Sequence, residues 1–192
     1  MQLFNEWYYF DNAIIDEVCD QLIHAGEYEF KKAEIQSGED DGSRRSDIKF
    51  INEQWLVDLI WPFMLDANKN SKWSFDVESV EDIQITKYKK HDYYSWHFDG
   101  LSDSSGIYTD QDQKFLYGNV RKLSMTILLN DDFEGGEFQI ASYNKGECFI
   151  KTPKMNKGSV IVFPSFIEHQ VLKVTEGERY SLVAWFLGKP FK

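Results

Sequence analysis

The first third of the chain carries hydrophobic residues at helical spacing. An apolar run follows Asp11-Asn12 and ends at Gly26; its members are Ile14, Ile15, Val18, Leu22 and Ile23. This spacing predicts a first helix. A second helix is predicted over residues 47–67, and its buried face would be formed by Ile48, Ile51, Trp55, Leu59 and Phe63. Pro62 lies inside this second run, where it is expected to kink or end the helix.

From Ser74 onward the pattern changes to short stretches rich in β-branched and aromatic residues, with turn residues between them. These stretches predict strands at 80–88, 93–98, 122–129, 137–142, 147–151, 159–163, 169–174 and 180–187. Since no helical pattern separates them, they predict an antiparallel sandwich or jelly roll. The expected fold class is therefore α+β and mainly β. We expect one domain, with residues 1–73 as a helical support packed on a core formed by residues 74–192.

Three polar segments interrupt these patterns. Residues 37–46 are predicted to form a loop, and residues 101–119 form either a surface insertion or a lid over a site. Gly135-Gly136 follow an acidic turn and predict a hairpin bend. That bend explains the glycines without a catalytic role for Glu137.

Composition and charge narrow the classes of function. Hydrophobic residues make up 42% of the chain and aromatic residues 16%, which is enough to fill a core and is not typical of disorder. The formal net charge of -11 argues against a protein whose main task is to bind nucleic acid, because phosphate contacts need a surplus of Lys and Arg. Lys87, Lys89 and Lys90 are the nearest approach to a basic patch, and we interpret them as a solvated strand edge.

The two cysteines, Cys19 and Cys148, belong to no CxxC pair, so we expect two reduced, partly buried thiols. The first residues lack the basic and apolar regions of a signal peptide, and the apolar stretch 56–65 is too short to cross a bilayer. A cytoplasmic location without membrane contact is the resulting expectation.

The strongest chemical signal is the sequence His97-Phe98-Asp99. Residues i and i+2 of a strand point to the same face, so a His and a carboxylate are presented side by side. One more ligand would complete the facial triad of two His and one carboxylate that suits non-haem Fe(II). Of the other three histidines, His169 at the start of a predicted strand is the best candidate.

A second signal lies ten residues after His169. Arg179 stands just before a predicted strand that reads YSLVAWF, and burying a guanidinium among such residues is costly without an anionic partner. A guanidinium binds a carboxylate through two parallel hydrogen bonds. A metal site beside a buried Arg therefore predicts a pocket for a dicarboxylic co-substrate. The alternative is a structural Arg paired with Glu176 or Glu178 at the surface.

Three stretches carry a resemblance to a known family: YKKHDYYSWHFD, RKLSMTILLNDDFEGGEFQI and KGSVIVFPSFIEHQVLKVTEGERYSLVAWFLG. They cover roughly half of the chain, in the family's order and spacing. The chain resembles the 2-oxoglutarate-dependent prolyl 4-hydroxylase-like superfamily, and within it the bacterial and phage PKHD-type hydroxylases. Arg179 and Phe138 stand where animal and plant prolyl 4-hydroxylases usually have Lys and Thr, which favours the PKHD-type group.

The resemblance implies a double-stranded β-helix (jelly roll) core and a role for eight residues. His97, Asp99 and His169 match the iron ligands, Arg179 and Tyr88 match the 2-oxoglutarate pocket, Tyr94 and Arg121 match positions of peptide substrate binding, and Trp185 matches an aromatic residue near the site. Strict alternation along the strand would direct Tyr93, not Tyr94, to the ligand face. A bend or bulge before Ser95 would reconcile the two.

The resemblance also implies an activity. Fe(II), 2-oxoglutarate and O2 would hydroxylate a C–H bond, with prolyl residues of a peptide or protein as the first candidate, and 2-oxoglutarate would be decarboxylated to succinate. L-Ascorbate is implied as a reductant, and the origin is expected to be bacterial or phage-type. Two alternatives stay open: a cupin-like metal-dependent hydrolase or isomerase, which would not need Arg179, and a catalytically silent jelly-roll binding module.

Overall fold

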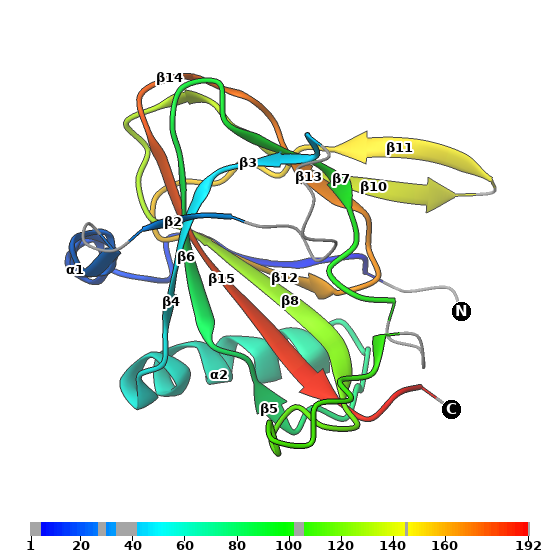
Figure 1. The fold of residues 1–192 in the computed structure, drawn as a ribbon. Helices are drawn as coiled ribbons and strands as arrows, with labels where there is room; N and C mark the ends of the chain where they lie inside the picture. The colour runs from blue at the N-terminus through cyan, green and yellow to red at the C-terminus, as the bar shows by residue number, and fades with distance from the viewer. Residues whose placement is uncertain (1–4, 27–29, 34–41, 102–105, 145, 192) are drawn as a thin grey trace.

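The computed structural model describes residues 5–26, 30–33, 42–101, 106–144 and 146–191. Two antiparallel sheets face each other, and one helix covers the outer face of the larger sheet (Figure 1). This arrangement is the predicted jelly roll, and the mainly β fold class is confirmed. The centre of the fold is the pairing of strands β8 (Val120–Leu128) and β15 (Arg179–Gly188), which brings Trp185 opposite Ser124.

Within the described residues, the larger sheet has the strand order β1-β12-β8-β15-β6-β4-β2, and β5 adds to β15. The smaller sheet has the order β11-β10-β13-β7-β3, and β14 pairs with β9 in a separate ladder. The remaining bounds are β1 Tyr8–Phe10, β2 Lys31–Lys32, β3 Arg44–Arg45, β4 Asp47–Ile51, β5 Ser79–Val80, β6 Ile83–Tyr88, β7 Tyr93–His97, β9 Glu134–Gly135, β10 Phe138–Asn144, β11 Glu147–Lys151, β12 Val160–Pro164, β13 His169–Val171 and β14 Val174–Glu176.

Two apolar clusters stabilise the layers. The larger cluster packs helices α1 (Asp16–Gly26) and α2 (Gln54–Asn70) against the larger sheet, with Leu22, Ile60 and Leu182 among its members. The smaller cluster lies between the two sheets and includes Ile161 and Val171. The sheets therefore enclose an apolar space, and polar side chains placed there lie in a poorly hydrated environment.

Six of the eight strands predicted after Ser74 are confirmed, with bounds that shift by a few residues. The other two are divided: 80–88 forms β5 and β6, and 169–174 forms β13 and the start of β14, which belong to different sheets. The prediction for the first third was incomplete, because β1, β2 and β4 of that region hydrogen-bond into the larger sheet. Residues 47–51 are strand β4, whereas a helix was predicted there. Pairing of β4 with β6 overrides the apolar spacing of this segment, because ladder hydrogen bonds depend on a distant partner strand. The division of the chain after residue 73 stays a prediction.

Helix α2 buries a different face from the one predicted. Leu56, Ile60, Met64 and Ala67 are buried, whereas Trp55 is 40% exposed. The helix also continues through Pro62 to Asn70. Pro62 lies on an exposed position, where its ring does not disturb the packing against the sheet.

Smaller predictions are also corrected by their tertiary context. Lys87 lies in β6, which is flanked by β15 and β4, and its ammonium pairs with Glu178 at 2.7 Å, so it is not on a strand edge.

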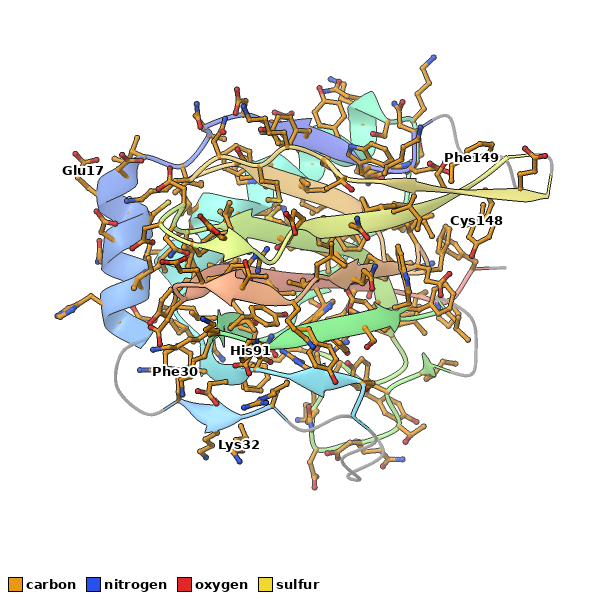
Figure 2. All side chains as sticks on the ribbon, turned by 90° about the horizontal axis from the view of Figure 1, so that it is seen from above. Glu17, Phe30, Lys32, His91, Cys148 and Phe149 are labelled. Carbon is orange, nitrogen blue, oxygen red and sulfur yellow. The ribbon has the colours of Figure 1, made fainter. Side chains whose placement is uncertain are left out.

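Cys19 is buried, but Cys148 is exposed near the end of the β10–β11 hairpin, as Figure 2 shows; both are free thiols. In the predicted loop 37–46, residues 37–41 lie outside the described part and Arg44–Arg45 form β3. Neither described helix is both long and apolar enough to cross a membrane.

Candidate active site

Three candidate metal ligands converge from two neighbouring strands. His97 is the last residue of β7, Asp99 lies in the bend that follows, and His169 is the first residue of β13. Antiparallel pairing sets His169 directly opposite His97. The amides of Asp99 and Gly100 donate to the carbonyl oxygen of Ser165 at 3.0 and 3.1 Å, which fixes the bend.

A β-bulge in β7 resolves the position of Tyr94. Val171 pairs with Tyr94 and His169 pairs with His97, so two steps along β13 correspond to three steps along β7. The extra residue reverses the alternation, and Tyr94 shares the ligand face with His97. The two rings stack with centroids 3.4 Å apart and an interplanar angle of 12°. Tyr93 instead donates a hydrogen bond from its hydroxyl to Gly42 O.

The ligand atoms of the triad lie close enough to share one ion. His97 Nε2 is 3.7 Å from Asp99 Oδ1, and His169 Nε2 is 3.6 Å from Asp99 Oδ2. One candidate ligand atom from each residue can be chosen so that all three lie within 4.8 Å of one another. Two histidines and one carboxylate are the donor set of a facial triad for non-haem Fe(II).

Backbone carbonyls orient both imidazoles. Nδ1 of His97 lies 2.8 Å from Ser95 O, and Nδ1 of His169 lies 2.9 Å from Ile167 O. A carbonyl oxygen only accepts, so each Nδ1 carries a proton and donates, and each Nε2 keeps its lone pair. The lone pairs are thus available toward Asp99, which is the tautomer that metal binding requires.

Burial and neighbouring charged groups shift the pKa values of His97 and Asp99 in the direction that favours metal binding. Burial, and then the neighbouring His169, lower the pKa of His97 to about 3, which leaves its imidazole neutral at physiological pH. For Asp99, burial opposes ionisation, but His169, His97 and Arg121 outweigh it and lower the pKa of the carboxyl below its usual value. A neutral imidazole and an ionised carboxylate are the states that bind a divalent metal.

Arg179 is a buried cation without a carboxylate partner among the described residues. It is 2% exposed, and its Nη1 donates to Ser181 Oγ at 3.0 Å. Its guanidinium lies 5.4 Å from the ring centroid of Tyr88. Burial lowers the pKa of Arg179 from its ordinary value. The surface pairing considered from the sequence does not occur, because Glu178 pairs with Lys87.

Two cavities that share Phe138 in their linings lie at the triad and at this guanidinium. The first is lined by all three candidate ligands together with Tyr88, Tyr94, Ser181 and Trp185. The second, of about 410 Å³, is lined by Arg179, Gly136 and Phe138, and Phe138 also lines the first. Gly136 makes room for the guanidinium stem, because a Cβ there would lie 2.9 Å from Arg179 Cδ. A dicarboxylic ligand fits the chemistry of this space, with metal ligands in one part and a cation in the other.

Arg121 is held by Glu81, a residue that the sequence did not single out. Nε and Nη2 of Arg121 each donate to a Glu81 carboxylate oxygen at 2.6 Å, and Nη1 donates to the carbonyl oxygen of Asp99 at 3.2 Å. The same guanidinium lies 4.0 Å from the ring centroid of Trp185, whose buried Nε1 has no hydrogen-bond partner among the described residues. Forty positions separate Glu81 and Arg121, so local pattern could not have revealed this pair.

Arg44 also reaches the site without a signal in the sequence. Its guanidinium lies 4.6 Å from the ring centroid of Tyr94, and it lines the cavity of the triad. Pairing of β3 with β7 brings it there. In the sequence it looked like one of two loop arginines.

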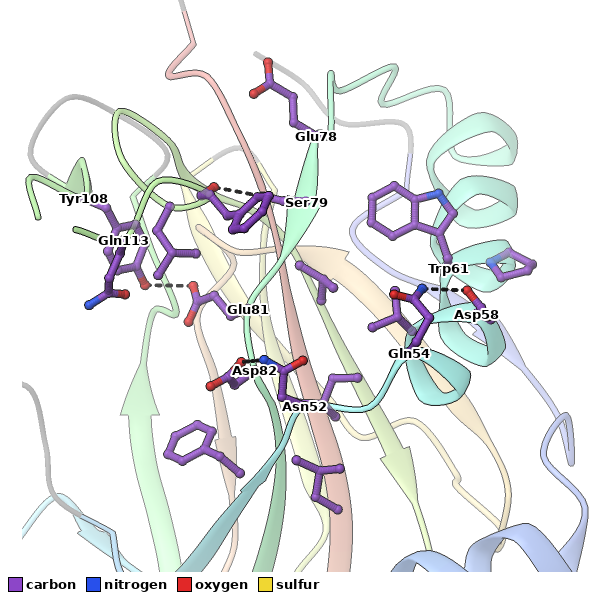
Figure 3. Close-up of a pocket in the computed structure, with 18 residues that line it drawn as sticks. Asn52, Gln54, Asp58, Trp61, Glu78, Ser79, Glu81, Asp82, Tyr108 and Gln113 are labelled. Atoms are coloured by element: carbon purple, nitrogen blue, oxygen red, sulfur yellow. Dashed lines mark hydrogen bonds between the residues drawn. The ribbon is translucent and has the colours of Figure 1, made fainter. Parts of the chain in front are cut away.

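Glu81 also lines a groove of about 990 Å³ (Figure 3). Its walls come from α2, from the residues around β5 and from the described part of segment 101–119, where Tyr108 donates to Glu81 at 2.7 Å. Four acidic residues line it, Asp58, Glu78, Glu81 and Asp82, and none of its described lining residues is basic. Whether segment 101–119 closes over the site stays a prediction, and residues 102–105 lie outside the described part.

Comparison with known proteins decides the family. The model of the 2OG-Fe(II) oxygenase superfamily matches residues 83–187, which is more than half of the chain. This chain belongs to the 2OG-Fe(II) oxygenase superfamily. The protein is accordingly a dioxygenase, and members of its superfamily use Fe(II) and 2-oxoglutarate. The alternatives of a cupin-like hydrolase and of a silent binding module are not supported.

Individual members of the superfamily are similar over different shares of the chain. A "Putative prolyl 4-hydroxylase" of Acanthamoeba polyphaga mimivirus is 24% identical over 98% of this chain and 76% of its own length. A PKHD-type hydroxylase of Prochlorococcus marinus (strain MIT 9301) is 36% identical, but the match covers 56% of this chain and only 42% of that protein. The viral collagen prolyl hydroxylase of Paramecium Bursaria Chlorella virus-1, solved as a 2OG complex, shares the fold with a TM-score of 0.65 at 23% identity, over 96% of this chain and 97% of that one.

Proposed function

We propose that this oxygenase hydroxylates a prolyl residue of a peptide or protein, with His97, Asp99 and His169 as iron ligands and Arg179 as the receptor for the distal carboxylate of 2-oxoglutarate. The observation that carries the assignment of the co-substrate is the buried guanidinium of Arg179, which has no carboxylate partner among the described residues. An uncompensated buried cation is costly, and a bound carboxylate would compensate it.

The chain's own residues would bind the iron and 2-oxoglutarate, orient them and exclude water from them. Iron and 2-oxoglutarate, when bound, would supply the chemistry that activates O2, with 2-oxoglutarate giving succinate and CO2. Ser95 O and Ile167 O hold the imidazoles with Nε2 toward the metal position. Tyr88 and Phe138 form apolar walls of the two cavities, which limits the water that reaches the co-substrate. Ascorbate as reductant rests on the family resemblance alone.

The substrate class is supported from two sides. One relative in sequence is named a putative prolyl 4-hydroxylase, and a prolyl hydroxylase of Trichoplax adhaerens bound to a peptide fragment shares the fold with a TM-score of 0.64. We propose that Tyr94, Arg121 and Trp185 face the substrate and that residues flanking the proline lie in the acidic groove.

Mass spectrometry of proline peptides with Lys or with Glu at the flanking positions tests the proposal that these residues lie in the acidic groove. We expect hydroxylation to favour the Lys peptides.

An anaerobic titration with Fe(II) and 2-oxoglutarate tests the co-substrate site. We expect a weak visible absorption band from the iron chelate in the wild type. Arg179→Ala should still bind iron, but its affinity for 2-oxoglutarate should fall about 10- to 100-fold, since a hydrogen bond to a charged group contributes roughly 1.5–3 kcal/mol.

Lys173→Ala is the matched control, because Lys173 is an exposed cation in the loop before β14. Equal affinities in Arg179→Ala and the wild type would refute the role of Arg179. If iron binds and no band forms at any concentration of 2-oxoglutarate, the co-substrate assignment fails.

We also propose a cytoplasmic location. The two free cysteines are consistent with a reducing compartment. Stable binding to nucleic acid is not part of the proposal, since the net charge is -11.

A further inference from the structure

The hairpin of β10 and β11 extends beyond the rest of the molecule. Figure 1 shows it projecting from the smaller sheet, and Figure 2 shows Cys148 and Phe149 far out along it. All five residues of β11 are exposed. Large apolar side chains are among the exposed residues of the hairpin: Tyr143 at 60%, Phe149 at 43% and Ile150 at 57%. The catalytic chemistry proposed above uses none of them.

The outer edge of β11 is an open strand edge. In the part of the chain that the structure describes, β11 pairs only with β10 and ends the order of the smaller sheet. The ladder between them is regular over five residue pairs, from Ile140–Lys151 to Asn144–Glu147. Edge strands are usually protected by short length, charged side chains, proline or bulges, because their free N–H and C=O groups attract another strand. The charged residues of β11 are Glu147 and Lys151, which are opposite in sign. β11 contains no proline and no bulge.

The sequence of β11, ECFIK, is complementary to itself in an antiparallel pair. If two copies pair about a two-fold axis at Phe149, Glu147 lies opposite Lys151 of the partner copy, and the reverse pair forms on the other side of the axis. Phe149 lies opposite its own equivalent. Opposite charges and aromatic pairs are the cross-strand neighbours that stabilise a ladder.

The other face of the same ladder is also matched. Cys148 would lie opposite Ile150 of the partner copy, twice, so apolar side chains meet apolar side chains. A register shifted by one residue loses both Glu–Lys pairs. The register centred on Phe149 therefore gives favourable cross-strand pairs on both faces of the ladder. In this register the same surface of each copy contacts the other, as in a two-fold dimer.

We propose that two copies of this chain associate through antiparallel pairing of β11, so that the two smaller sheets form one continuous sheet across the axis. The occupant of the open edge is a second copy, because the charges and the apolar residues of β11 match their own reversed order.

Exchange of the two charges tests the pairing. Sedimentation velocity of the full chain under reducing conditions, over a wide range of concentrations, should show a monomer–dimer equilibrium. Lys151→Glu places like charges opposite each other at both ends and should shift the chain to monomer. Adding Glu147→Lys to that variant restores the opposite charges in reversed order, and the dimer should return. Lys69→Glu, an exposed change of the same charge on α2, should leave the equilibrium unchanged.

Cross-linking tests the register independently. In a Cys148→Ser background, Phe149→Cys would place the two introduced thiols opposite each other on the axis, and mild oxidation should give a covalent dimer. Ile150→Cys in the same background faces the serine of the partner copy and should cross-link far less. A wild-type chain that is monomeric at all concentrations, a dimer insensitive to Lys151→Glu, or equal cross-linking of the two variants would each overturn the proposal.

Discussion

At the scale of single residues, the site depends on which polar groups are satisfied by the protein itself. The imidazoles of His97 and His169 are satisfied at Nδ1 by carbonyl oxygens, and their Nε2 atoms are left for a metal. Within the described part of the chain, the guanidinium of Arg179 donates to one side chain, that of Ser181. Arg121, by contrast, is engaged by the Glu81 carboxylate at both ends of its guanidinium. Arg179 is therefore the better anion receptor, and Arg121 is better suited to hold the backbone of Asp99.

Glu81→Gln should lower both the stability of the fold and its affinity for iron. The change removes the charge partner of Arg121 and leaves a half-buried guanidinium with weaker contacts, so the free energy of unfolding should fall by about 1–3 kcal/mol. Because Arg121 also donates to Asp99 O, iron affinity should fall as well. Urea denaturation and anaerobic iron titration measure the two effects.

Glu78→Gln is the matched control for this experiment. Glu78 lines the same groove, but its pair with Lys189, at 3.8 Å, is largely exposed. An exposed pair of this kind contributes little, so we expect a change within about 1 kcal/mol and unaltered iron affinity. If both variants behave alike, Glu81 has no special role in holding Arg121.

At the scale of elements, backbone geometry matters in two places. Gly135 and Gly136 shape the region beside Arg179, and one face of α2 packs against the larger sheet. Gly136 has a φ of +66°, and a Cβ there would also come within 3.0 Å of Val174 Cγ2. The hairpin predicted at Gly135-Gly136 does not form, because β9 pairs with β14 whereas β10 pairs with β11 and β13. The missing side chain of Gly136 also leaves space beside Arg179. The glycine pair in the sequence does not by itself indicate this space.

Gly136→Ala should affect both stability and the co-substrate. The new methyl group meets Arg179 and Val174 and is held in a left-handed conformation, so we expect a loss of about 1–3 kcal/mol in the free energy of unfolding. Displacement of Arg179 should also weaken binding of 2-oxoglutarate. In Gly146→Ala the φ is +85° and the Cβ meets nothing within 4 Å. That variant should lose stability alone, and a parallel loss of 2-oxoglutarate affinity there would contradict the prediction.

The buried face of α2 can be tested by truncation. Ile60 is fully buried against the larger sheet, whereas Leu65 is 50% exposed. Ile60→Ala should lower the free energy of unfolding by about 2–5 kcal/mol, and Leu65→Ala by no more than about 1 kcal/mol. Chemical denaturation of the two variants measures the difference. The reverse order would mean that α2 packs through another face.

At the scale of the whole molecule, the two sheets act as the walls of the site and the helices seal the opposite face of the larger sheet. His97 and His169 come from the smaller sheet, and Arg179 and Trp185 come from the larger. A ligand that binds both parts bridges the two sheets. Ligand binding should therefore stabilise the fold as a unit.

Thermal unfolding under anaerobic conditions tests this bridging. With Fe(II) and 2-oxoglutarate at about 100 times their dissociation constants, each binding step adds about 2.7 kcal/mol of stability. For a chain of this size, each step corresponds to a rise in Tm of roughly 5–10 °C, and the two steps together to roughly 10–20 °C. A chelator should reverse the rise. His169→Ala should abolish it, whereas His24→Ala, an exposed change on α1, should retain it. An unchanged rise in His169→Ala would exclude that residue as a ligand.

The sequence by itself predicted most of the strands after Ser74, the convergence of His97, Asp99 and His169, and a buried position for Arg179. These features are local: alternation within a strand, two ligands separated by one residue, and a charged residue in an apolar strand. The family resemblance added the roles of Tyr88 and Tyr94 for the same reason, since their motifs are continuous in the chain.

Only the tertiary structure decided the rest. Residues 47–51 form a strand because β6 pairs with them, and Tyr94 faces the site because β7 contains one residue more than β13 over the same span. Glu81 meets Arg121, and Arg44 meets Tyr94, through strands that are distant in the sequence. Hydrogen-bonded pairing joins residues without regard to their local propensity. A pattern read along one segment therefore cannot say which partner that segment will meet.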